Sequence, residues 1–90
     1  MKKIKTIYLP GYVQVDGVHE DLVTGPRAYE NYNEAEKVLL DLHLTPTKKT
    51  LEVNILDLNG NSQFLKAYTN TFEENRNRYY FIATIHFQGL

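Results

Sequence analysis

The densest run of apolar positions in this chain spans residues 78–87. It is rich in aromatic and β-branched side chains and lacks Gly, Pro, Asp and Glu, which predicts a β-strand. Alternation places Tyr79 and Phe81 on one face of this strand, and Tyr80 and Ile82 on the other. Because both faces are largely apolar, we expect this strand at the centre of a sheet, covered on both sides.

A helical pattern lies in the middle of the chain. Asn33 and Glu36 have the spacing of a capping box, and Thr45-Pro46 marks a stop. The pattern therefore predicts a helix over 33–43. Its apolar stripe comprises Ala35, Val38, Leu39 and Leu42, and Tyr29 and Tyr32 continue the stripe back towards Pro26.

Shorter alternating runs flank the helix. Residues 3–9 read as a first strand, which Pro10-Gly11 is expected to break or kink. Asp16-Gly17 then predicts a type I′ turn within a hairpin over 12–20. A two-residue turn there would place Val15 opposite Val18, Gln14 opposite His19 and Val13 opposite Glu20.

Beyond the helix, Lys48-Lys49 opens a second alternating run, and Asn59-Gly60 predicts a second type I′ hairpin. The polar stretch 69–77 is expected to be a mobile loop. The predicted hairpin register pairs Ile55 with Phe64, Val53 with Lys66 and Leu51 with Tyr68, and it places Leu65 and Ala67 on the opposite face.

These elements predict a single α+β domain over residues 1–90. Its mainly antiparallel sheet has five to six strands and two type I′ hairpins, with one helix packed on one face. Such a sheet is about 24–29 Å wide, whereas a helix is about 10 Å across. We therefore expect the face that bears Tyr80, Ile82, Leu65 and Ala67 to be uncovered, as apolar protein interfaces are.

Composition narrows the classes of function. The formal net charge of −1 gives little attraction to duplex DNA or an anionic membrane surface. The absence of cysteine excludes disulfides and thiolate metal sites. Neither a secretory h-region nor a membrane span is recognisable in the sequence, so a cytoplasmic location is expected.

Candidate chemistry is sparse. His19, His43 and His86 lack the close spacing of a zinc site. The acidic pairs lie in predicted turns or on a wet helix edge, whereas a catalytic carboxylate needs burial to raise its pKa. The sequence thus predicts no catalytic residues, no metal and no cofactor.

The leading hypothesis is a small non-catalytic protein-binding module, of accessory, inhibitor or adaptor type, that also forms homo-oligomers. The composition, rich in asparagine and lysine, suggests an accessory protein of a low-GC bacterium or its phage. The alternative is a single-stranded nucleic-acid-binding protein that uses the basic and aromatic stretch 76–82. The candidate partner-binding residues are Phe72, Arg76, Arg78, Tyr80 and Ile82.

Overall fold

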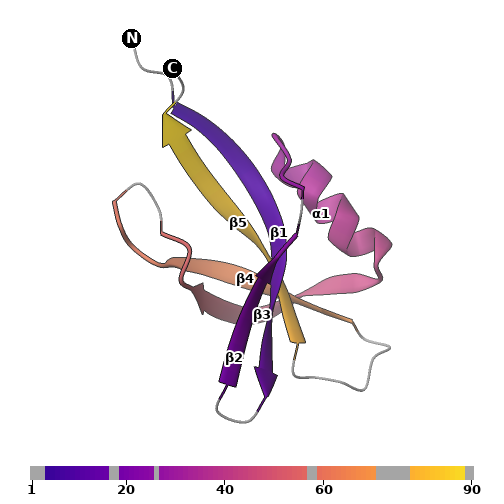
Figure 1. Cartoon of the computed structure of the whole chain (residues 1–90). Helices are drawn as coiled ribbons and strands as arrows, with labels where there is room; N and C mark the ends of the chain where they lie inside the picture. The colour runs from indigo at the N-terminus through magenta and orange to yellow at the C-terminus, as the bar shows by residue number, and fades with distance from the viewer. Residues whose placement is uncertain (1–3, 17–18, 26, 57–58, 71–77, 89–90) are drawn as a thin grey trace.

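The computed structural model describes residues 4–16, 19–25, 27–56, 59–70 and 78–88. Within these residues, five strands and one helix follow each other along the chain (Figure 1). The elements are β1 (Ile4–Asp16), β2 (His19–Thr24), α1 (Tyr32–Asp41), β3 (Leu44–Val53), β4 (Gln63–Asn70) and β5 (Arg78–Gln88).

The strands form one antiparallel sheet in the order β2-β1-β5-β4-β3. The predicted α+β class and the central position of β5 are confirmed. The β1–β5 pairing is the longest in the sheet and runs from Ile4↔Gln88 to Gln14↔Arg78.

Pro10-Gly11 was predicted to break or kink the first strand, and the structure shows no break. β1 continues through both residues, with Pro10 opposite Ile82. Pro10 has no N–H to donate, and its carbonyl oxygen accepts from the Gly25 N–H at 2.7 Å. The missing donor would point away from β5, so the β1–β5 ladder loses no hydrogen bond at this position.

The first hairpin has a different register from the predicted one. Asp16 pairs with His19 and Val15 pairs with Glu20 instead of Val18, so the turn lies one residue later than predicted. The partner of each β1 residue thus moves by two positions. Because side chains alternate with a period of two, this shift leaves every residue on its predicted face.

The second hairpin departs further from prediction. β3 begins at Leu44 instead of Lys48, contains a register shift between Pro46 and Thr50, and ends nine residues before β4. Val53 pairs with Gln63 instead of Lys66, a shift of three positions. An odd shift exchanges the faces, so Leu65 lies with Leu51 and Val53.

The helix is shorter than predicted at its C-terminal end. It begins at Tyr32, after an Asn31 N-cap that makes no side-chain capping bond, so the predicted Asn33 capping box does not form. It ends at Asp41, and His43 adopts a left-handed conformation with φ of 62°. This turn leads straight into β3.

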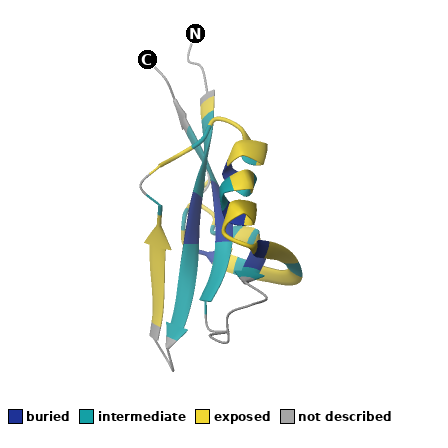
Figure 2. Cartoon of the chain, turned by 90° about the vertical axis from the view of Figure 1, so that its right-hand side faces the viewer, coloured by how far each residue is buried: buried dark blue, intermediate teal, exposed yellow. Residues whose placement is uncertain are grey.

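Helix α1 lies on the face of the sheet to which Tyr80 and Ile82 belong, here called the helix face (Figure 2). The expectation that this face is uncovered is therefore wrong for its centre. Ile82 is only 3% exposed and packs with Leu39 of the helix, and Tyr80 is partly buried against the same cluster. The cluster comprises Ala35, Leu39, Leu44, Tyr68 and Ile82.

The opposite face, here called the curled face, is covered by the sheet itself. Val53 of β3 and Phe81 of β5 belong to one buried cluster, although β4 lies between their strands. In a flat sheet they would be about 10 Å apart. The sheet must therefore curl, and Figure 1 shows the β3–β4 ribbon crossing the β1–β5 ribbon at a steep angle.

The two ribbons join over a short distance. Between β4 and β5 the only ladder pair in the described residues is Tyr68↔Tyr80. Farther along, the Gln63 side chain takes the place of a strand neighbour: the Thr84 N–H donates to Gln63 Oε1 at 2.9 Å, and Gln63 Nε2 donates to the Thr84 carbonyl oxygen at 2.5 Å. One side-chain amide thus satisfies a backbone position that the crossing leaves unpaired.

Candidate functional site

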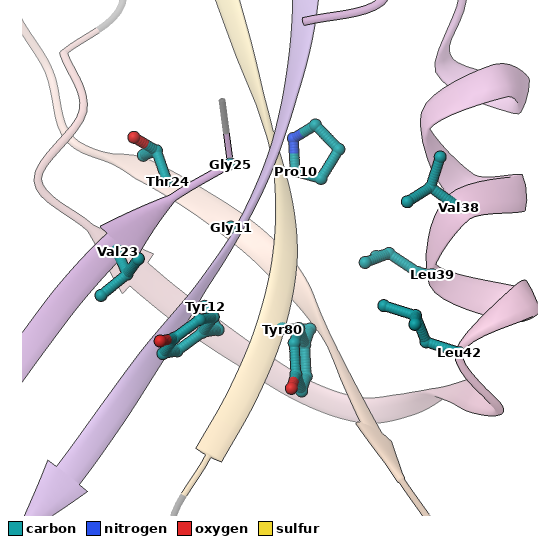
Figure 3. A pocket seen from close by; sticks show the side chains of 10 residues that line it. All are labelled: Pro10, Gly11, Tyr12, Val23, Thr24, Gly25, Val38, Leu39, Leu42 and Tyr80. Atoms are coloured by element: carbon teal, nitrogen blue, oxygen red, sulfur yellow. The ribbon is translucent and has the colours of Figure 1, made fainter. Parts of the chain in front are cut away.

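An apolar groove of about 280 Å³ runs between α1 and the β1–β2 hairpin (Figure 3). Its walls include large apolar side chains that solvent reaches, with Leu42 54% and Val23 40% exposed. The helix covers the part of the sheet around Tyr68 and Ile82, so the part of the helix face beside it stays open. The groove is lined by Pro10, Gly11, Tyr12, Val23, Thr24, Gly25, Val38, Leu39, Leu42 and Tyr80.

Cross-strand pairing builds the floor of the groove. Tyr12 of β1 pairs with Val23 on one side and with Tyr80 on the other, which sets three apolar side chains in a row across β2, β1 and β5. The Tyr12 and Tyr80 rings lie 5.4 Å apart between centroids, in a tilted arrangement. Such cross-strand aromatic pairs stabilise the sheet through contact between the two rings.

A polar row follows on the same face. Gln14 pairs with Asp21 of β2 and with Arg78 of β5. The Arg78 guanidinium donates to Gln14 Oε1 from Nη2 at 2.6 Å and from Nε at 3.1 Å, and it lies 4.3 Å from the centre of the Tyr12 ring. The apolar floor therefore ends at a guanidinium that is anchored within the chain.

Tyr68 fixes the helix wall against the sheet. Its hydroxyl donates to Glu36 Oε2 at 2.5 Å and lies 2.9 Å from the Tyr32 hydroxyl. Because the single Tyr68 proton goes to Glu36, Tyr32 must donate in the second bond. Burial raises the pKa of Tyr68 well above its usual value, and its bonds to Glu36 and Tyr32 raise it further.

Only part of the predicted binding set can be placed. Tyr80 lines the groove, Arg78 lies at its polar end, and Ile82 is buried beneath the helix and cannot contact a partner directly. Phe72 and Arg76 lie outside the described residues, as does most of the predicted loop 69–77. Thr69 and Asn70, which begin that predicted loop, belong to β4.

The sequence interpretation missed the other groove residues. Val38 and Leu42 were assigned to the apolar stripe of the helix, yet only Ala35 and Leu39 of that stripe are buried. The signal was the width of the stripe, which exceeds what one contact with the sheet can bury. Tyr12 and Val23 become neighbours only in the register that the structure shows.

Within the described ranges, no group of three His, Asp or Glu side chains is arranged to hold a metal ion. None of the helices in that part of the chain is long and apolar enough to cross a membrane. Comparison with protein-family models, with curated proteins and with solved structures finds no match to this chain.

Proposed function

We propose that this protein is a small non-catalytic binding module that recognises a partner protein through the groove between α1 and the β1–β2 hairpin. The observation that carries the proposal is the solvent-exposed apolar wall formed by Val23 and Leu42. Exposed apolar side chains that gather around a depression are typical of protein-interaction sites, whereas isolated ones are common on any surface.

The dimensions of the groove favour a protein ligand. Small-molecule sites commonly enclose about 300–1,000 Å³ and bury most of the ligand. At about 280 Å³ this groove lies at the lower limit of that range, and it is open, because Leu42 on its wall remains largely exposed. It suits one or two apolar side chains presented by a partner helix or extended segment.

Hydrogen bonds and ring contacts around the groove favour a site that is formed before the partner binds. Tyr68 ties α1 to the sheet through Glu36 and Tyr32, and paired aromatic rings hold the floor. A rigid site loses little conformational entropy when a partner binds. Arg78 and Asp21 lie two strands apart at the polar end, where they can orient a partner's charged groups.

The alternative, binding of single-stranded nucleic acid, draws less support from the described residues. The Arg78 guanidinium is engaged by Gln14 and by the Tyr12 ring, so a phosphate would have to compete for it. The Tyr79 ring points to the curled face, where the Lys49 ammonium lies 4.0 Å from its centre. Two aromatic residues of the proposed stacking strand thus lie on opposite faces.

A peptide selection with matched variants tests the groove. Peptides selected from a random library on the wild-type protein are measured against Leu42→Glu and Leu40→Glu. Both changes place a carboxylate on an exposed part of the helix end, where Leu42 is 54% and Leu40 46% exposed, but only Leu42 lines the groove. We expect Leu42→Glu to weaken binding by at least about tenfold, because it buries a charge in the contact.

Leu40→Glu should bind as the wild type does. Peptides that bind both variants equally well would show that the groove is not the site. Salt-sensitive binding of labelled single strands by the wild type would support the nucleic-acid alternative instead.

A further inference from the structure

β5 leaves one backbone edge unpaired near the end of the chain. Beyond the crossing with β4, β1 is the only described strand that pairs with it, so residues 4–9 and 83–88 form a two-stranded arm (Figure 1). Two-stranded ribbons are marginally stable by themselves, and three or more strands are needed for independent stability.

The outward backbone groups of this arm can be assigned. Tyr8 exchanges two backbone bonds with Tyr29, of 2.7 and 2.8 Å, so its N–H and C=O point away from β5. Its partner Thr84 must likewise point away from β1, as its bonds to Gln63 show. Because orientation repeats every two residues, His86 and Gln88 also direct their N–H and C=O groups outward.

This edge lacks the protection seen on the other free edges. β3 carries Pro46, Lys48, Lys49 and a register shift, which discourage pairing with another strand. β2 carries the acidic pair Glu20-Asp21, and β1, the other strand of the arm, carries Lys5. In contrast, the sequence contains no charged residue and no proline from Tyr79 to Leu90.

We propose that two copies of this chain associate through antiparallel pairing of β5 with β5, in a register centred on Phe87. That register pairs His86 with Gln88 of the second copy, and the reverse, and it leaves the Gln63 bonds to Thr84 intact. Antiparallel pairing of one strand with its own copy is two-fold symmetric, so the contact closes as a dimer. The two arms become one four-stranded sheet, β1-β5-β5-β1.

This dimer is independent of the groove and replaces the self-association expected through Ile82, which is buried within one chain. The contact is short, so the dimer should be weak, with an affinity in the range of small transient interfaces. Sedimentation equilibrium between about 10 µM and about 1 mM should therefore show a monomer–dimer equilibrium.

The arm offers a closely matched pair of variants. His86→Pro removes an outward N–H from the β5 edge, whereas Thr6→Pro makes the same change on the β1 edge. The two residues face each other, and each variant loses the same 2.8 Å contact between Thr6 Oγ1 and His86 Nδ1. Neither change removes a hydrogen bond between β1 and β5.

We expect His86→Pro to weaken dimerisation by at least about tenfold and Thr6→Pro to leave it unchanged. A wild-type monomer up to about 1 mM, or equal dimerisation of all three proteins, would overturn the proposal. Hydrogen exchange of the wild type tests it without a substitution. The His86 and Gln88 amides should exchange more slowly as concentration rises, while the Thr6 amide should not; a dimer without this protection would also overturn it.

Discussion

Ile82 and Phe81 are neighbours on β5, yet different elements of the molecule bury them. Ile82 lies beneath α1, among tyrosines and beside the hydrogen bonds of Tyr68. Phe81 lies beneath a ribbon of its own sheet, in a cluster with Val53 and Ala83 that contains no polar side chain. The buried cluster of the helix face therefore includes directional side-chain bonds, whereas the buried cluster of the curled face consists of apolar side chains.

This difference has a functional consequence. On the curled face, the depressions between the β1–β2 hairpin and β3 are lined in part by charged side chains, among them Glu20 and Glu52. A single helix covers a strip about 10 Å wide, and the floor beside it, at Tyr12 and Val23, stays accessible. The groove beside this narrow cover differs from those depressions in being lined almost entirely by apolar residues.

Among the variants that test this comparison, Phe81→Ala should have the largest effect on stability. Phe81 has no exposed surface, and removing its ring leaves a cavity between the two ribbons, which should cost about 3–5 kcal/mol in the free energy of unfolding. Urea denaturation followed by circular dichroism measures this change. Phe64→Ala is the matched control, because Phe64 is 71% exposed and its loss should change stability by less than about 0.5 kcal/mol. Similar costs for both variants would mean that the curled face is not a packed core.

Gly11→Ala addresses the place where the two faces meet. The Gly11 backbone forms part of the groove floor, while an added Cβ would lie 2.8 Å from Phe81 Cζ and 2.6 Å from the Val23 carbonyl oxygen. Overpacking of this kind should cost about 1–3 kcal/mol in unfolding free energy. Gly25→Ala, whose Cβ would meet its nearest atom at 3.0 Å, should cost less. Equal stability of Gly11→Ala and the wild type would show that the Phe81 ring and the β2 backbone can move to admit the added methyl group.

The sequence was informative where periodicity alone decides the structure. β5 is apolar on both faces and lies at the centre of the sheet, and the stripe over Ala35 and Leu39 forms the buried side of the helix. Both features follow from the local spacing of apolar positions, whichever element covers the apolar face. Local patterns could not predict which element covers each face, because this depends on the steep crossing of the β1–β5 and β3–β4 ribbons.

Turn dipeptides were a weaker guide to the binding site. Asn59-Gly60 does form a turn at Gly60, with φ of 83°, but it lies inside a nine-residue connection and does not set the register. Packing of the buried Val53 and the half-buried Leu65 on one face favours the observed pairing instead. The groove was inaccessible to sequence reasoning for the same reason, since Val23 and Leu42 belong to elements whose relative position is set by tertiary packing.

The smallest expected effect tests the directional bonds of the helix face. Tyr68→Phe keeps the ring but removes the hydroxyl that joins Glu36 and Tyr32, and it should cost about 1–2 kcal/mol in unfolding free energy. Tyr79→Phe, a hydroxyl deletion outside this hydrogen-bonded group, is the control and should cost less.

The pH dependence separates this hydroxyl from simple packing. The pKa of Tyr68 is raised in the folded state by burial and by its hydrogen bonds, whereas in the unfolded chain it lies near about 10. The protonated hydroxyl therefore contributes its full stabilisation below about pH 10, and the contribution is lost as pH rises above that value, because only the unfolded state then releases the proton readily. In urea unfolding at about pH 8 and about pH 10.5, the stability advantage of the wild type over Tyr68→Phe should shrink at the higher pH. An advantage that is the same at both pH values would show that folding does not raise the pKa of Tyr68. No advantage at either pH would show that Tyr68 acts through its ring alone.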